Sequence, residues 1–250
     1  MPRPRKDTGQ TKVGEGAPPA ERLTPVTENY LMCLYKLWED SLVPTLTQLT
    51  DTIRRLPASE GLGTSVPSVA GMIRRMRRQA LVDVGPDKRI RLTKKGFEDA
   101  ENIVRRHRLA EWLVVRLLGM DLHLAHTEAH RLEHVMSSEF EEKLAERLGY
   151  PKRCPFGRPI PGSGEPRMPV DALTLDSAEL GVTYVVQRVP EEDPQLLNFL
   201  IRSMILPDQE ITVVEAAQYV GVLMVDTQGE KVSIGYNVAR QILVSAPDAA

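Results

Sequence analysis

The sequence predicts a mainly α-helical protein with a small β domain at its C-terminal end. Apolar residues recur at the three- and four-residue spacing of helices over most of residues 27–148, whereas short runs of alternating residues follow from residue 182. Between these regions, a stretch rich in Pro and Gly at residues 154–169 interrupts regular structure. A chain of 250 residues can bury a sizeable core, and we expect two or three domains.

Residues 1–22 are rich in Pro, Gly and charge, and they lack the apolar centre of a secretory signal. They predict a disordered tail. No apolar run approaches the roughly 20 residues that cross a bilayer, so no membrane partner is expected. The only two cysteines, Cys33 and Cys154, are too few for a disulfide framework and favour a cytoplasmic location.

Three helices are expected after the tail. The first begins at Thr27, a plausible N-cap, and the second covers residues 45–56, where Pro57 prevents its continuation. The third is capped by Ser65 and tolerates Pro67 in its first turn. It carries arginines on its polar side, which favours a nucleic-acid surface over a purely structural helix.

A β-hairpin is expected next, because alternating runs at residues 81–84 and 89–93 flank the turn 85–88. Three helices followed by a basic hairpin are typical of a winged helix-turn-helix, here at residues 23–95, whose third helix enters the major groove of DNA. A small structural helical subdomain is the alternative. Charge favours the DNA interpretation: residues 1–110 contain 20 Lys and Arg against 13 Asp and Glu, and the remainder contains 12 against 21.

Residues 96–165 predict a helical domain. One long helix is expected at residues 93–118, followed by helices at 125–138 and 139–148. Their apolar surplus predicts packing against a second copy of the chain. A homodimer would also place two recognition helices one DNA turn apart.

All five histidines lie in this region, which indicates a metal site. Residues four apart share one face of a helix, and neutral imidazole and carboxylate groups suit first-row divalent metals. The spacing predicts two sites, the second joined by a group from the first helix. One set is His107, Glu111 and His126, and the other is His130, Glu133 and His134. A set of surface His and Glu contacts is the alternative.

The last third, residues 170–250, predicts a small antiparallel barrel. Five short strands are expected at residues 182–189, 210–215, 220–225, 231–234 and 241–244, with a helix at 195–205. No Walker loop, dinucleotide fingerprint or nucleophile elbow is present, so an enzyme is not indicated.

Three segments carry a resemblance to a known family: His-Arg-Leu-Ala-Glu at residues 107–111, Glu-His-Val-Met-Ser at 133–137 and Cys-Pro-Phe-Gly-Arg-Pro-Ile-Pro-Gly at 154–162. From about Thr27 to Val244 the chain resembles the diphtheria toxin repressor family of metal-activated transcriptional regulators. The resemblance implies a winged helix-turn-helix, a helical dimerisation domain with two metal sites, and a C-terminal SH3-like barrel related to FeoA.

The resemblance also implies the ligands of both sites. The ancillary site would use His107, Glu111 and His126, completed by Glu192 and Gln195 from the barrel, although an acidic loop is nearly as good an interpretation of that pair. The primary site would use His130, Glu133, His134 and Asn29. Here the chain departs from the pattern, because His130 stands where relatives have Cys or Glu, and Asn29 stands where they have Met or Asp. Met32 or Glu28 could replace Asn29 as the ligand from the first helix.

Recognition residues follow in the same way. Ser65, Pro67 and Ser68 match the start of the family's recognition helix, but Gly71 stands where many relatives have Gln. Phosphate contacts are therefore expected to dominate. Their candidates are Arg74, Arg75, Arg77, Arg78, Lys88 and Arg89.

These features together predict a cytoplasmic homodimeric repressor that binds double-stranded operator DNA when loaded with Mn(II) or Fe(II), with two sites per subunit. The exchange of thiolate for imidazole at position 130 argues against the softest ions and leans toward Mn(II). Two alternatives stay open. One is a helical His and carboxylate metalloenzyme, and the other is a regulator of this fold in which metal is only structural.

Overall fold

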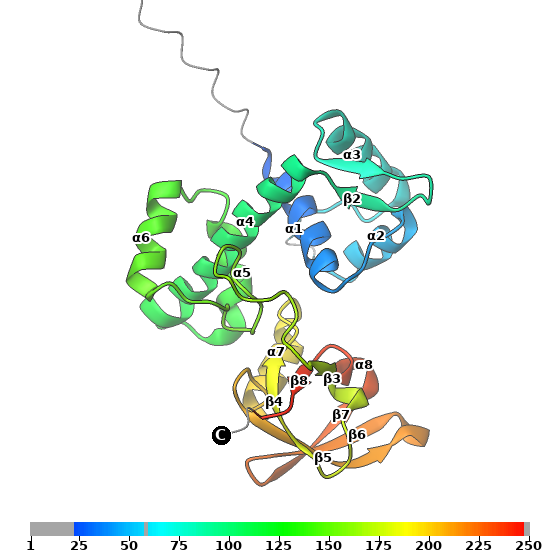
Figure 1. The fold of residues 1–250 in the computed structure, drawn as a ribbon, viewed down its shortest axis with the longest axis vertical. Helices are drawn as coiled ribbons and strands as arrows, with labels where there is room; N and C mark the ends of the chain where they lie inside the picture. The colour runs from blue at the N-terminus through cyan, green and yellow to red at the C-terminus, as the bar shows by residue number, and fades with distance from the viewer. Residues whose placement is uncertain (1–22, 58–59, 248–250) are drawn as a thin grey trace, which may run out of the picture.

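A computed structural model describes residues 23–57 and 60–247. Figure 1 shows an N-terminal lobe that carries α3, a middle lobe of helices around α5 and α6, and a C-terminal lobe built on a sheet. Helix α4 runs from the first lobe into the second. The tail predicted at residues 1–22 lies outside the described residues.

Among its described residues, the N-terminal lobe contains three α-helices and a hairpin, in the predicted order. The elements are α1 (Pro25–Glu39), α2 (Leu46–Ile53), α3 (Val66–Arg78), β1 (Val82–Val84) and β2 (Ile90–Leu92). The two strands pair antiparallel, with Val82 opposite Leu92. Leu31, Leu49 and Met76 are fully buried where the helices meet.

Two predicted helix ends in this lobe are wrong. Helix α1 begins one turn earlier than expected, because the Thr24 hydroxyl caps it by accepting a hydrogen bond from the Thr27 amide at 3.3 Å. Helix α2 ends at Ile53 and not at Leu56. The last residues form a tighter turn, with the Leu56 amide donating to the carbonyl of Ile53 at 3.1 Å, since the following proline disfavours helical backbone before it.

The middle lobe contains α4 (Lys94–Trp112), α5 (Ala125–Leu132) and α6 (Ser138–Leu148). The predicted single helix to residue 118 changes to a π-helical turn at Leu113–Leu117, and a short 3-10 helix (Leu122–Leu124) precedes α5. Helix α5 is shorter than expected, because residue Ser137 acts as the N-cap of α6 and so begins a new helix.

The C-terminal lobe is a six-stranded antiparallel sheet with the strand order β3-β8-β4-β5-β6-β7. Its strands are β3 (Leu173–Thr174), β4 (Thr183–Arg188), β5 (Glu210–Ala217), β6 (Val222–Thr227), β7 (Glu230–Gly235) and β8 (Leu243–Ser245). Helices α7 (Pro194–Arg202) and α8 (Tyr236–Ala239) flank them, together with 3-10 helices at Leu175–Ser177 and Gln218–Val220. The two-residue strand β3 was not predicted, and α7 ends three residues before Ile205.

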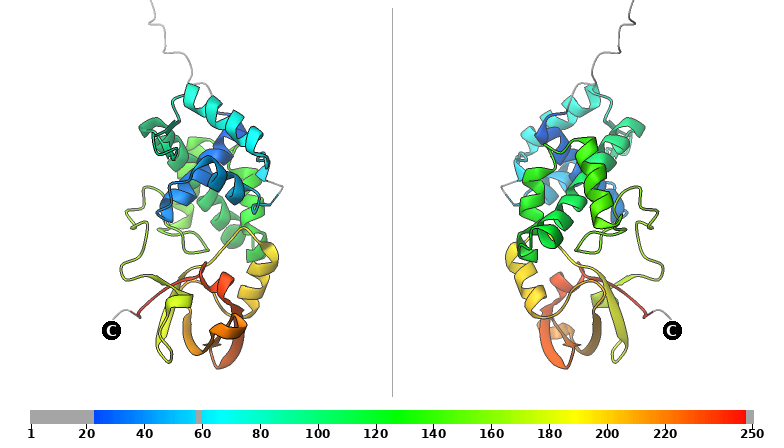
Figure 2. Two further views of the ribbon diagram at one scale, coloured as in Figure 1. Left: turned by 90° about the vertical axis from the view of Figure 1, so that its right-hand side faces the viewer. Right: turned by 90° about the vertical axis from the view of Figure 1, so that its left-hand side faces the viewer.

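Buried and partly buried ion pairs join the three lobes. The carboxylate of Glu39, at the end of α1, accepts hydrogen bonds from both terminal nitrogens of Arg108 on α4, at 2.7 and 2.6 Å. Arg158, in the loop after α6, donates to the same carboxylate at 3.2 Å. Arg188 on β4 lies 2.8 Å from Asp40. Figure 2 shows the resulting arrangement from two sides, with α3 at the end of the molecule opposite the sheet.

No helix among the described residues is both long and apolar enough to span a membrane.

Candidate metal centre

Helices α4 and α5 bring the first predicted set of ligands together. Nε2 of His107 lies 3.0 Å from Oε1 of Glu111 and 3.0 Å from Nδ1 of His126. Glu191, from the loop before α7, joins them, and one potential ligand atom from each of the four residues lies within 4.8 Å of the others. All four side chains are buried. We call this group the first cluster.

A second cluster forms around Glu133, which is fully buried just after α5. Its Oε2 contacts Nδ1 of His107, and its Oε1 lies 3.0 Å from Nδ1 of His130. The same Oε1 lies 3.3 Å from Nε2 of His134. His107 therefore belongs to both clusters, with one ring nitrogen facing each. The sequence spacing had assigned His107 to the first set alone.

Helix α1 contributes to the second cluster through acidic and amide groups. Oε2 of Glu28 lies 2.7 Å from Nδ1 of His134. The side-chain nitrogen Nδ2 of Asn29 lies 3.3 Å from Nε2 of His130. The side-chain oxygen Oδ1 of Asn29 is buried and accepts no hydrogen bond from any described residue. Met32 instead packs in the apolar core of the N-terminal lobe. The geometry thus favours Glu28 and Asn29 over Met32 as the contribution of α1.

The loop before α7 differs from what the family resemblance implied. Glu191 faces the first cluster, while Oε1 of Glu192 lies 3.3 Å from Nζ of Lys36. Gln195 is exposed at the start of α7, where its backbone amide donates to Asp193. The structure therefore brings Glu191 to the cluster in place of the predicted Glu192 and Gln195. Nζ of Lys36 also lies 2.6 Å from Oε1 of Glu191, so a partly buried lysine neutralises that carboxylate.

One further residue of the centre, Glu60, escaped prediction. It lies between α2 and α3, is only 7% exposed, and places Oε1 3.3 Å from Nε2 of His126. Its Oε2 lies 3.6 Å from Nε2 of His130. Glu60 is a single acidic residue in a turn of small residues, so no helical or strand spacing relates it to the histidines.

The charges of the two clusters are strongly coupled. Burial lowers the pKa of His107, but the charges of Glu133 and Glu111 outweigh burial and raise it to about 10. Burial raises the pKa of Glu133, but the charge of His107 and its hydrogen bond lower it to about 2. Without an ion, a protonated imidazole thus compensates these buried carboxylates.

The side chains fit a divalent cation. Both carboxylate oxygens of Glu111 and Oε1 of Glu133 are buried, and no described group donates a hydrogen bond to them in acceptable geometry. Buried carboxylates of this kind require a hydrogen bond, a charge partner or a metal. Imidazole nitrogens and carboxylate oxygens, with no thiolate among them, are a donor set that first-row divalent ions accept.

The predicted DNA-contacting residues are exposed. The hydroxyl of Ser65 accepts from the Ser68 amide at 3.3 Å and caps α3, and Pro67 is exposed in the first turn. The arginines of α3 are exposed, namely Arg74, Arg75, Arg77 and Arg78. In the wing, Lys88 and Arg89 are exposed, although Arg89 donates to the carbonyl of Val43. The α3 arginines are thus exposed to a partner, and one of them, Arg77, lies 3.8 Å from Asp83 on β1.

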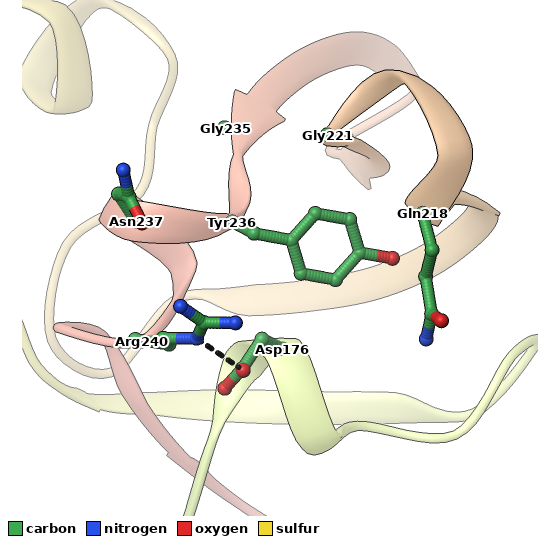
Figure 3. Close-up of a pocket in the computed structure, with 7 residues that line it drawn as sticks. All are labelled: Asp176, Gln218, Gly221, Gly235, Tyr236, Asn237 and Arg240. Carbon is green, nitrogen blue, oxygen red and sulfur yellow. Dashed lines mark hydrogen bonds and ion pairs between the residues drawn. The ribbon is translucent and has the colours of Figure 1, made fainter.

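A separate pocket of about 540 Å³ lies on the C-terminal lobe (Figure 3). The ring of Tyr236 crosses it, and Arg240 at its edge donates to Asp176 at 3.1 Å. No residue that lines this pocket belongs to either metal cluster.

Comparison with known proteins agrees with this architecture. Residues 93–162 match the model of the "Iron dependent repressor, metal binding and dimerisation domain", and residues 173–246 match the FeoA domain. The chain is 29% identical to a solved "manganese-dependent transcriptional repressor complex with manganese", with a TM-score of 0.76 over 88% of this chain and 100% of that one. For the manganese regulator SloR the TM-score is 0.72, at 29% identity, over 90% and 100%.

Curated relatives extend over almost the same length. The chain is 32% identical to the diphtheria toxin repressor of Corynebacterium efficiens over 90% of this chain and 97% of that protein. It is 33% identical to the iron-dependent repressor IdeR of Mycobacterium tuberculosis over 89% and 97%. The match to the repressor of Corynebacterium glutamicum, at 42% identity, covers 59% of that protein. The chain therefore belongs to the diphtheria toxin repressor family of metal-dependent transcriptional regulators.

Proposed function

We propose that this protein is a homodimeric repressor that binds operator DNA when Mn(II) or Fe(II) occupies its two clusters, and that it restrains genes of metal uptake. The observation that carries the proposal is the position of the clusters. Ligand atoms from α4, α5 and the residues just after α5 meet groups from α1 and from the turn before α3, so these residues would let a bound ion hold the N-terminal lobe against the middle lobe.

In the first cluster, His107, Glu111, His126 and Glu191 would hold an ion. In the second, His130, Glu133 and His134 would do so, with Asn29 or Glu28 from α1. The ion would supply positive charge that neutralises the buried carboxylates and fixes the relative position of the helices. Both cysteines of the chain are buried and lie outside the two clusters, so the donors are nitrogen and oxygen only, which leans toward Mn(II) with Fe(II) next.

The mechanism is thermodynamic linkage. If metal stabilises the arrangement in which the two recognition helices match the groove spacing, metal and DNA raise each other's affinity by the same factor. Such couplings are typically about 1 to 3 kcal/mol, or roughly 5- to 150-fold. The exposed arginines of α3 would then contact phosphates, while Ser65, Pro67 and Ser68 face the bases.

A dimer accounts for apolar side chains that the isolated chain leaves exposed in the middle lobe. Val135 is 73% exposed and Phe140 is 49% exposed, and they flank the start of α6. Leu117 and Leu118, after α4, are exposed as well. Packing against a second copy would bury such groups. We assign residues 23–95 to DNA binding, 96–165 to metal binding and dimerisation, and 170–250 to the SH3-like domain.

The proposal is tested by operator binding at controlled free Mn(II), Fe(II) and Zn(II), with EDTA as the metal-free reference. Alanine at Glu133 or His134 is expected to abolish the metal response while circular dichroism shows an intact fold. His123→Ala is the matched control, because His123 lies in the same stretch but in neither cluster. A full metal response in the Glu133 and His134 variants would show that the second cluster is not the regulatory site.

A further inference from the structure

Glu60 lies where the DNA-reading part of the chain meets the metal centre. It follows α2 and stands five residues before Ser65, the N-cap of α3. Although it belongs to a connection between helices, it is only 7% exposed. A buried carboxylate in a loop is costly unless it is paired, so its partners are informative.

Those partners are the outer nitrogens of two candidate ligands. Oε1 of Glu60 lies 3.3 Å from Nε2 of His126, and Oε2 lies 3.6 Å from Nε2 of His130. The other nitrogen, Nδ1, of His126 lies 3.0 Å from His107 in the first cluster, and that of His130 lies 3.0 Å from Glu133 in the second. Nε2 of His126 therefore has Glu60 as its hydrogen-bond partner, whereas Nε2 of His130 lies between Glu60 and the side-chain Nδ2 of Asn29, which is 3.3 Å away.

This arrangement has a known chemical role at metal sites. A histidine that ligates a metal with one nitrogen usually donates its other ring N–H to a carboxylate or carbonyl, which fixes the tautomer and the ring orientation. We propose that Glu60 is a positioning residue that holds Nε2 of His126 by a hydrogen bond and lies against Nε2 of His130, and so ties both metal clusters to the turn that leads into the recognition helix. The inference rests on the proposed function.

Glu60 is held at its backbone as well as at its side chain. The side-chain nitrogen Nδ2 of Asn29 donates a hydrogen bond to the backbone carbonyl of Glu60 at 2.7 Å. Side chain and backbone of Glu60 are therefore both anchored to the metal centre.

The turn that follows Glu60 packs closely against the start of α3. A Cβ atom at position 63 would lie only 2.0 Å from Oγ of Ser68, so no side chain fits there. The backbone of the turn at Gly63 therefore lies in close contact with the first turn of α3. Nε of Arg54, the C-cap residue of α2, also donates to the carbonyl of Thr64 in this turn at 3.0 Å. A change in the position of Glu60 would therefore reach Ser65 and Ser68.

The test compares Glu60→Gln and Glu60→Ala with the wild-type chain, each full length. Mn(II) affinity is measured by isothermal titration calorimetry, and amide hydrogen exchange is followed with and without Mn(II). We expect alanine to weaken Mn(II) binding 10- to 100-fold, the range found for such outer carboxylates. Glutamine keeps one acceptor oxygen and is expected to recover part of this loss.

Hydrogen exchange distinguishes two roles of Glu60: coupling of the metal site to residues 61–68, and support of the metal site alone. At saturating Mn(II), the wild-type chain is expected to protect residues 61–68 as well as α5, whereas Glu60→Ala is expected to protect α5 alone. Glu128→Gln is the matched control, because this carboxylate lies on α5 between the two histidines but pairs with Arg131 at the surface. It is expected to behave as wild type.

Two results would overturn the inference. Either Glu60→Ala binds Mn(II) with wild-type affinity, or it binds more weakly but still protects residues 61–68 fully at saturation. Failure of the proposed function would appear differently, as a wild-type chain whose operator binding does not respond to Mn(II) or Fe(II).

Discussion

Removing the Arg108 guanidinium should destabilise the whole molecule. Arg108 is 1% exposed, and both its terminal nitrogens donate to the equally buried carboxylate of Glu39. Breaking a buried ion pair from one side typically costs about 3 to 5 kcal/mol. Because Arg158 still donates to Glu39 at 3.2 Å, Arg108→Met should cost about 3 kcal/mol, at the lower end of that range. For a chain of this size, that loss lowers Tm by roughly 6 to 12 °C.

The assay is thermal unfolding followed by circular dichroism in EDTA, so that bound metal does not contribute to stability. The double variant Glu39→Gln with Arg108→Met should lose less than the sum of the two single variants, because no uncompensated carboxylate remains. Arg131→Met is the control: its pair with Glu128 is exposed and should contribute about 0 to 1 kcal/mol. A Tm loss below about 2 °C for Arg108→Met, or strict additivity in the double variant, would refute the reasoning.

Three further outcomes are expected. Burial raises the pKa of Glu39, but the charge of Arg108 outweighs burial and lowers this pKa below its ordinary value. The ionised carboxylate therefore stabilises the fold above about pH 4.5, and this stabilisation is lost in acid. Between pH 7 and pH 3, the Tm of Glu39→Gln should consequently fall less steeply than that of the wild-type chain. Gly157→Ala should lower Tm by at least about 4 °C, because its Cβ would lie 1.9 Å from the Gln187 carbonyl oxygen, whereas Gly164→Ala, with open space, should lose less. Arg75→Ala should reduce the slope of log affinity against log salt by about 1 in operator titrations, and an unchanged slope would remove this residue from the phosphate contacts.

Periodic features of the sequence predicted most of the architecture. The apolar spacing located the helices and the alternating runs located five of the six strands of the C-terminal sheet, because burial of one face imposes a period on the chain. Helix ends were less predictable: Thr24 and Thr27 are both good caps, and only the packed structure selects Thr24. Strand β3 is two residues long and has no period to detect.

The metal centre was predictable where its ligands lie on helices and unpredictable where they lie in loops. Spacing by four placed His107 and Glu111 on one face of α4. By contrast, neighbouring loop residues such as Glu191 and Glu192 point in different directions that depend on the local backbone, which no spacing rule defines. Glu60 is a similar case, because its position depends on how the turn folds back onto α5.

The shared ring of His107 has a consequence for how the two clusters fill. A neutral imidazole has one lone pair and one N–H, so His107 can act as a ligand toward only one side at a time. If Nε2 ligated an ion beside Glu111, Nδ1 would carry the hydrogen and donate it to Glu133, the central carboxylate of the other cluster. If Nδ1 instead ligated an ion beside Glu133, Nε2 would carry the hydrogen. The two clusters would therefore compete for one imidazole, and the tautomer of His107 would depend on which cluster it serves.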